Sequence, residues 1–265
     1  MNLGEKAELQ FIISASILRG KMIKFRNDIP LFINTVKIPV GDRLVSVDVP
    51  NSINVDKIAN LSDEKLQEFC NFHSILKAGP FSKADIYLND IGYSLKYSGS
   101  QPAAIINHTA RPGWENVAKY KGVDIKLLDQ IIDHYWILRE EGKIKEDIKN
   151  SETNSPFRLN YSVLYPYLEY FSFEGSGSRH SNNPAAYLIE FNNPFNPNTW
   201  IVKRRDDFLR DIWPKLIFSL RSKKGMPPDI NSNKIDPLLK KSVLRWSKFH
   251  QGSLRGSLHV RISNS

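Results

Sequence analysis

Polar residues that could act on a phosphate recur within residues 82–97, Ser-Lys-Ala-Asp-Ile-Tyr-Leu-Asn-Asp-Ile-Gly-Tyr-Ser-Leu-Lys-Tyr. Two runs of alternating polar and apolar residues flank positions 89–92, whose residue types favour a turn, so the segment predicts a β-hairpin. Because side chains alternate between the faces of a strand, one face carries Asp85, Tyr87, Ser94 and Lys96. A four-residue loop would place Asp85 opposite Lys96, and a two-residue loop would place it opposite Ser94.

A carboxylate beside an ammonium group is suited to the hydrolysis of a phosphodiester. The carboxylate binds a hard divalent cation, usually Mg²⁺, which stabilises charge on the phosphate. A nearby lysine positions or deprotonates the attacking water. One carboxylate supplies too few ligands for Mg²⁺. We therefore expect a second carboxylate from the N-terminal helix, where Glu8 is favoured over Glu5. Asp48 and Glu190, each in a predicted strand, are alternative ligands.

An Asp on one strand, followed on the next by a residue-x-Lys tripeptide, resembles the PD-(D/E)xK nuclease superfamily. A helix carrying Gly-x-x-x-Glu, here Gly4 to Glu8, is also common in that superfamily. Carried over residue by residue, the resemblance implies that Asp85 and Glu8 bind metal and that Lys96 is the catalytic lysine. Ser94 supports the site at the position that is usually acidic, and Ala84 rather than Pro precedes Asp85.

The overall layout resembles type II restriction endonucleases. This resemblance implies an α/β (α+β) fold with a restriction-endonuclease-like core, in which helices flank a mixed central β-sheet. It implies Mg²⁺-dependent cleavage of double-stranded DNA at a short recognised sequence, in a prokaryotic cytoplasm. A cognate methyltransferase is expected by analogy with the family alone. Two-fold symmetric sites favour a homodimer, although the length also allows a monomer.

Hydrophobic periodicity and turn residues predict the elements that position these side chains. Helices are expected over residues 4–19, 61–77, 112–150 (broken near Gly122), 204–221 (kinked at Pro214) and 236–249. Strands are expected over residues 31–36, 43–49, 185–191 and 256–262, besides the hairpin. The aromatic-rich residues 161–173 predict a strand or a packed turn. Residues 1–150 are expected to form the nuclease core, and residues 151–265 a basic DNA-recognition region continuous with it.

The composition indicates a globular protein with an anionic partner. The 265 residues are 41% hydrophobic and 25% charged, and a single cysteine, Cys70, excludes an intrachain disulfide and favours a reducing compartment. The longest early apolar stretch, residues 9–18, is too short to span a membrane. The net charge is +9, and residues 201–265 alone hold 15 basic and 5 acidic residues. This asymmetry favours nucleic acid as the partner.

Residues with small polar, amide or basic side chains are the expected DNA contacts. Some would bind phosphates and others would read base edges, as Arg and Asn do in the major groove. They are Ser98, Ser100, Gln101, Arg111, Arg179, His180, Asn182, Asn183, Lys203, Arg204, Arg205, Lys223, Lys224, Arg255, His259 and Arg261.

Two other functions are compatible with this sequence. The first is a non-catalytic DNA-binding protein in which the hairpin is structural, because an exposed Asp–Lys pair is common and contributes only about 0–1 kcal/mol. The second is a nuclease of the same superfamily that acts in repair and cuts at a DNA structure rather than at a sequence.

Overall fold

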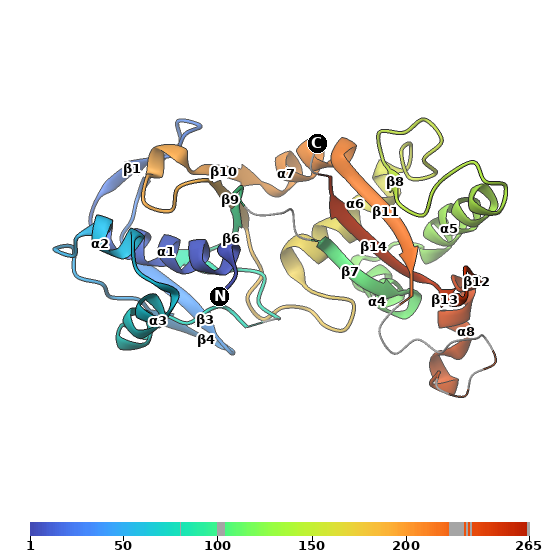
Figure 1. Cartoon of the computed structure of the whole chain (residues 1–265), viewed down its shortest axis with the longest axis horizontal. Coiled ribbons are helices and arrows are strands. Elements are labelled where there is room, and N and C mark those ends of the chain that lie inside the picture. The colour runs from blue at the N-terminus through green and yellow to red at the C-terminus, as the bar shows by residue number, and fades with distance from the viewer. Residues whose placement is uncertain (80, 100–103, 223–230, 232, 234, 264–265) are drawn as a thin grey trace. The chain divides into compact units, whose positions relative to one another are not determined.

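The computed structural model describes residues 1–79, 81–99, 104–222, 231, 233 and 235–263 (Figure 1). The chain forms two compact units. Unit 1 comprises Met1–Gln101, Phe173–Gly175 and His180–Phe208, and unit 2 comprises Pro102–Ser172, Ser176–Arg179 and Leu209–Ser265. Each unit is thus assembled from separate stretches of chain, whereas the functional regions expected from the sequence, 1–150 and 151–265, are continuous.

Unit 1 contains a mixed sheet. Within the described residues its six strands lie in the order β10 (Ile201–Arg204), β9 (Tyr187–Phe191), β6 (Ile91–Tyr97), β5 (Ile86–Leu88), β3 (Val36–Val40) and β4 (Arg43–Ser46). Neighbouring strands are antiparallel except β6 and β9, which are parallel. The expectation of a mixed sheet with helices is confirmed at this level. A separate hairpin pairs β1 (Met22–Lys24) with β2 (Pro30–Phe32).

Helix α1 (Leu3–Ile17) packs against the sheet at β6 and β3 (Figure 1). The helix begins with a capping box, because the Asn2 side chain accepts from the Glu5 N–H and the Glu5 carboxylate accepts from the Asn2 N–H. The Phe11 ring lies 4.8 Å from Phe191 and 4.1 Å from Trp200, measured between centroids. This apolar packing fixes the helix that carries Glu8. Helices α2 (Val55–Ala59) and α3 (Asp63–Phe72) complete the unit.

Unit 2 pairs an antiparallel sheet with helices. Within the described residues the strand order is β7 (Ala104–Ala110), β14 (Ser257–Ile262), β11 (Leu216–Arg221) and β8 (Ile148–Lys149). Its core contains fully buried aromatic residues, and the Phe157 and Phe218 rings stack 4.1 Å apart. The remaining elements are α4 (Arg111–Lys121), α5 (Ile125–Glu140), α6 (Tyr161–Glu169), α8 (Pro237–Arg245) and a hairpin of β12 (Lys248–His250) and β13 (Ser253–Arg255). Gly122 ends α4 in the left-handed conformation, where the sequence predicted a break.

Several expectations about secondary structure are wrong. Residues 31–36 do not form one strand, because β2 ends at Phe32 and β3 begins at Val36. The helical segment expected to reach residue 150 ends at Glu140. Residues 161–173 form α6 and a π-helical turn, Tyr170–Glu174, rather than the expected strand or packed turn, because Leu164, Tyr167, Leu168 and Phe171 bury one helical stripe. Their aromatic content had favoured a strand, but packing overrides this weak propensity.

Residues 204–221 do not form one kinked helix. The helix α7 (Arg205–Ile212) ends before Pro214, and the chain then enters strand β11. Proline ends a helix at least as readily as it kinks one, because it lacks the N–H and clashes with the preceding turn. Among the helices that the structure describes, none combines the length and apolar character required to cross a membrane.

Candidate active site

The predicted hairpin forms with the shorter of the two expected turns. Asn89 and Asp90 both have positive φ, 51° and 64°, as a two-residue type I′ turn requires. The register pairs Leu88 with Ile91 and Ile86 with Tyr93, which places Asp85 opposite Ser94 rather than Lys96. The Asp85 N–H donates to the Tyr93 carbonyl at 2.9 Å, so Asp85 is bonded to β6 just before the ladder begins at Ile86.

Asp85 and Lys96 are held by the backbone of Leu95. Asp85 lies just before the start of β5, and its Oδ2 accepts from the Leu95 N–H at 2.7 Å. The Lys96 ammonium donates to the Leu95 carbonyl at 3.1 Å and to Ser94 Oγ at 3.0 Å. Ser94 Oγ in turn lies 3.4 Å from Asp85 Oδ2. Three of the four residues predicted on one face therefore form one hydrogen-bonded group: Asp85, Ser94 and Lys96. Ser94 lies between the carboxylate and the ammonium.

Glu8 reaches this group from α1. The half-buried carboxylate of Glu8 has a pKa raised to about 7, first because burial disfavours its charge and then because the Asp85 carboxylate repels it. The ammonium groups of Lys96 and Lys77 act in the opposite direction. Burial and the repulsion by Asp85 together therefore keep Glu8 partly protonated near neutral pH.

Two lysines, Lys77 and Lys83, border the site. Lys77 donates to Glu5 at 2.7 Å, and although burial lowers its pKa, this hydrogen bond together with the Glu8, Glu5 and Asp85 charges raises it overall. Lys83 is half-buried and within electrostatic range of Lys96 and Asp85. Sequence reasoning missed both lysines, because Lys77 and Lys83 lie outside the strands of the hairpin.

The donor set fits Mg²⁺. A protein usually binds this cation through one or two carboxylates, with water and substrate phosphate completing the shell. Glu8 and Asp85 supply two carboxylates, and a cation between them would relieve the repulsion that raises the pKa of Glu8. Among the described residues no group of three or more His, Cys, Asp or Glu side chains is arranged to hold a metal. Further ligands would therefore come from water or substrate.

The alternative ligands have other partners. Glu190 is in register with Lys96 on the neighbouring strand β9, and its carboxylate pairs with Lys203 at 3.0 Å. Asp48 pairs with Arg19 at 2.5 Å. The structure therefore brings Glu8, Asp85, Ser94 and Lys96 together and gives Glu190 and Asp48 their own ion pairs.

The asparagines expected to read DNA support the hairpin instead. The Asn182 amide donates to Asp42, and the buried Asn183 amide donates to the Gly41 carbonyl at 3.0 Å. The Asn183 carbonyl accepts from the N–H groups of both Lys83 and Ala84, at 3.0 and 2.9 Å. Asn183 thus fixes the chain just before Asp85. On the same loop, Arg179 and His180 are exposed.

The other predicted contacts in unit 1 lie near the end of β6 and on β10. Ser98 follows β6, and its hydroxyl donates to the Phe191 carbonyl at 3.1 Å. Lys203 pairs with Glu190. Arg205 donates to Glu174 at 2.7 Å, whereas Arg204 is exposed and forms no ion pair with a described residue. Four predicted contacts lie outside the described residues: Ser100, Gln101, Lys223 and Lys224.

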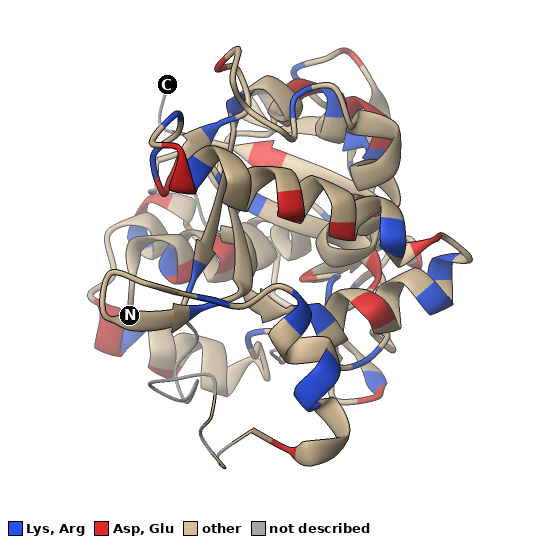
Figure 2. Ribbon diagram, turned by 90° about the vertical axis from the view of Figure 1, so that its right-hand side faces the viewer, with Lys and Arg blue, Asp and Glu red and all other residues tan. Residues whose placement is uncertain are grey.

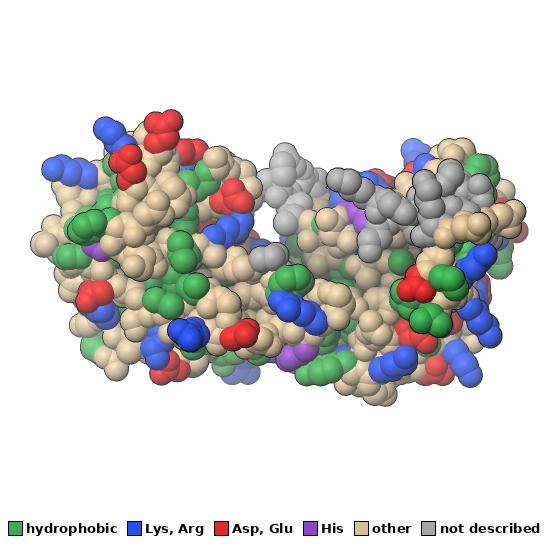
Figure 3. Space-filling view, turned by 90° about the horizontal axis from the view of Figure 1, so that it is seen from below, with side chains coloured by type: hydrophobic (Ala, Val, Ile, Leu, Met, Phe, Trp, Pro, Cys, Tyr) green, Lys and Arg blue, Asp and Glu red, His purple; other side chains and the backbone are tan. Residues whose placement is uncertain are grey.

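Three predicted basic contacts of unit 2 are held in ion pairs. Arg111 is only 11% exposed and makes a bidentate pair with Asp129, at 2.8 and 2.9 Å. Arg255 pairs with Glu146, and Arg261 pairs with Asp147 at 3.0 Å. The pairs of Arg255 and Arg261 compensate part of the positive charge that the sequence concentrates after residue 200. Basic and acidic positions are accordingly interspersed along the ribbon (Figure 2) and over the face in Figure 3.

His259 is buried rather than available to DNA. Strand β14 lies between β7 and β11, so it is an interior strand of the sheet. The ring of His259 packs 4.6 Å from that of His108. Burial, then the charges of His108, Arg221 and Arg261, lower the pKa of His259 to about 4. The residue is therefore neutral at physiological pH.

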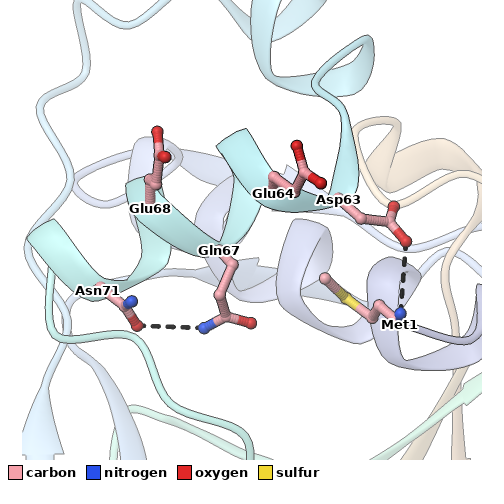
Figure 4. Close-up of a pocket in the computed structure, with 6 residues that line it drawn as sticks. All are labelled: Met1, Asp63, Glu64, Gln67, Glu68 and Asn71. Atoms are coloured by element: carbon pink, nitrogen blue, oxygen red, sulfur yellow. Dashed lines mark hydrogen bonds and ion pairs between the residues drawn. The ribbon is translucent and has the colours of Figure 1, made fainter.

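An acidic pocket of about 380 Å³ lies elsewhere in unit 1 (Figure 4). It is lined by Met1, Asp63, Glu64, Gln67, Glu68 and Asn71. Asp63 is paired with Lys6 at 3.0 Å, and the pocket includes none of the residues of the Asp85–Lys96 group. Its charge would repel a phosphate, so we do not assign it a part in phosphate chemistry.

Comparisons of the chain with protein-family models, curated proteins and solved structures find no match. The functional argument therefore rests on the geometry of this site.

Proposed function

We propose that this chain is a Mg²⁺-dependent endonuclease that hydrolyses phosphodiester bonds of double-stranded DNA at a specific sequence, as type II restriction enzymes do. One observation carries the proposal: Asp85, Ser94 and Lys96 form one hydrogen-bonded group, and the Glu8 carboxylate is electrostatically coupled to Asp85 and Lys96. The sequence resemblance to PD-(D/E)xK nucleases requires this grouping of a helix Glu, a strand Asp and a strand Lys.

Each residue has a role that follows from its contacts. Glu8 and Asp85 would hold Mg²⁺, which when bound neutralises charge on the phosphate and lowers the pKa of water. The Leu95 N–H orients the Asp85 carboxylate. Two of the three N–H groups of Lys96 are directed to Ser94 and Leu95, which leaves one to orient the attacking water. Ser94 thus positions Lys96 and is not itself expected to bind metal.

Replacement of Lys96 tests this assignment. Lys96→Ala should lower the rate of DNA cleavage by about 10²- to 10⁴-fold, the range of general acid–base contributions, while DNA binding is retained. Lys65→Ala, at an exposed position of α3, is the matched control and should cleave like the wild type. Cleavage by the Lys96→Ala variant at the rate of the control would exclude Lys96 from the chemistry.

A further inference from the structure

A bulge in strand β7 brings two histidines of unit 2 together. In the register of β7 with β14, two residues of β7, Asn107 and His108, lie opposite the single residue His259. His108 has a positive φ of 45°, a conformation that is uncommon for residues other than glycine. The rings of His108 and His259 lie 4.6 Å apart, measured between their centroids. The local backbone thus holds two imidazole rings against each other.

The protonated nitrogen of His108 is defined by its hydrogen bond. Its Nδ1 lies 3.2 Å from the Ser222 carbonyl oxygen. Because a carbonyl oxygen only accepts, Nδ1 carries the proton, and in the neutral ring Nε2 has the lone pair. A histidine that binds a metal through one ring nitrogen usually donates the other N–H to a group such as a backbone carbonyl. His108 is therefore held in the tautomer that leaves Nε2 able to coordinate a metal.

His259 has a buried nitrogen whose hydrogen-bonding capacity the protein does not use. The residue is only 7% exposed, and its Nδ1 has no hydrogen-bond partner among the described residues. On the same face of β14, Ser257 Oγ is likewise buried and without a partner in that part of the chain. Buried polar groups normally have a partner, and a water or an ion is a common one where the protein supplies none.

Two arginines near the histidines are engaged by one carboxylate. Arg261 lies on the same face of β14 as His259, and Arg221 lies two residues beyond Ser219, which pairs with His259. Asp147 accepts from Arg221 at 2.7 Å and from Arg261 at 3.0 Å. This carboxylate reduces the repulsion that the guanidinium groups exert on a cation at the histidines, and it makes them less available to an anion.

From this geometry we infer that His108 Nε2 and His259 Nδ1 bind a late first-row divalent metal ion such as Zn²⁺. Neutral imidazole suits Zn²⁺, Cu²⁺ and Ni²⁺, whereas Mg²⁺ prefers oxygen ligands. Two protein ligands leave the rest of the coordination shell to water or to a bound molecule, which agrees with the lack of any larger group of metal-binding side chains among the described residues. Both histidines belong to unit 2, whereas Glu8 and Asp85 belong to unit 1. The inference is therefore independent of the proposed function.

Titration of the untagged full chain with Zn²⁺ tests the inference directly. Isothermal titration calorimetry in excess Mg²⁺ should show Zn²⁺ binding with a stoichiometry near one. His108→Asn should weaken this binding by at least about tenfold, because even the loss of a group that supports a metal ligand costs that much. Asparagine tolerates the left-handed backbone that His108 adopts. His134→Asn, which removes an exposed histidine of α5, is the matched control and should bind Zn²⁺ like the wild type.

Several outcomes would overturn the inference. They are the absence of Zn²⁺ binding, equal affinities of the His108→Asn and His134→Asn variants, and a loss of Zn²⁺ binding in Glu8→Gln, which would place the ion at the candidate active site. Electron paramagnetic resonance of the chain loaded with Cu²⁺ then identifies the ligands. We expect the signature of two imidazole nitrogens in the wild type and of one in His108→Asn, whereas a spectrum of oxygen ligands alone would contradict the inference.

Discussion

The candidate site shifts the ionisation of the Glu8 carboxyl group. Its pKa of about 7 arises from burial and from repulsion by Asp85, and both effects act on the metal-free protein. Below this pKa the carboxyl keeps its proton and is a poor ligand, because a proton competes with the cation for the same oxygens. The affinity for Mg²⁺ should therefore be linked to pH near neutrality.

We predict that Mg²⁺ binds about tenfold more weakly at pH 6 than at pH 8, as one competing proton with this pKa requires. Isothermal titration calorimetry at the two pH values measures the difference. Glu8→Gln should bind more weakly at pH 8 and lose this dependence. A wild-type affinity that is equal at both pH values would show that Glu8 does not bind the metal.

The same shift predicts how the metal-free protein responds to pH. The folded pKa lies above the ordinary value of 4.5, so between pH 4.5 and 7 the folded state binds more protons than the unfolded state. Stability from this group is therefore lost as the pH rises through that range. At pH 8, Glu8→Gln should be more stable than the wild type by on the order of 1–3 kcal/mol in urea unfolding without metal. Lower stability of the variant would contradict the assigned cause of the shift.

For single residues, the sequence predicted which side chains of the hairpin come together, but not the length of its turn or the partners of its neighbours. Alternation along two strands placed Asp85, Ser94 and Lys96 on one face, because that period is a property of every strand. The choice between two loop lengths required the left-handed conformations of Asn89 and Asp90. Asn182 and Asn183 could not be assigned from sequence, because their partners Asp42 and Gly41 are about 140 residues away along the chain.

Among the elements, the hairpin depends on a close approach to the loop that precedes β9. A Cβ at Gly92 would lie 2.8 Å from the Pro184 carbonyl oxygen and 3.1 Å from Ala84 Cβ. Gly92 pairs with Tyr87, two residues from Ser94, so a shift of the strand here would displace the candidate site. Because Gly92 has no side chain, the segment around Pro184 can pack directly on β6.

We predict that Gly92→Ala lowers the free energy of unfolding by about 1–3 kcal/mol, the cost of overpacking a close contact. It should also reduce cleavage more than the loss of folded protein explains. Gly79→Ala is the control, because no atom lies within 4 Å of the added Cβ and its φ is not in the left-handed region. Equal stability of the two variants in urea unfolding would show that the contact at Gly92 is not tight.

Local signals predicted elements well where they were specific. The capping box at Asn2 and Glu5, the Ser62 cap of α3 and the Gly122 end of α4 all involve residue types with one dominant local role. Residues 161–173 were mispredicted because aromatic side chains fit either a strand or a buried helix, and only packing decides between them.

In the folded molecule, basic and acidic residues that are far apart in the sequence lie side by side. The excess of basic residues after position 200 is matched in unit 2 by acidic residues from earlier in the chain, such as Glu146 and Asp147. Net charge along a sequence cannot reveal such pairs, because they depend on tertiary contacts. Exposed basic residues without ion pairs, such as Arg204 among the described residues, are therefore the better candidates for contact with DNA.

The discontinuous assembly of unit 1 leads to a prediction for truncation. Strand β6 pairs in parallel with β9, and Phe11 packs on Phe191 and Trp200. The partners β9, Phe191 and Trp200 all lie after residue 150. A fragment of residues 1–150 should therefore fail to fold cooperatively, as measured by circular dichroism during heating. A fragment that unfolds cooperatively, with the stability of the full chain, would contradict this account of the core.

The most direct test of the proposed function is incubation of the purified chain with long unmethylated DNA, with Mg²⁺ and with EDTA in parallel. The site predicts discrete fragments that form with Mg²⁺, do not form with EDTA and are lost in Lys96→Ala. A smear would indicate cleavage without sequence specificity, as expected of a repair-type nuclease. Intact DNA together with a salt-sensitive gel shift would contradict the proposed function, and the Asp85–Lys96 hairpin would then be a structural element of a DNA-binding protein.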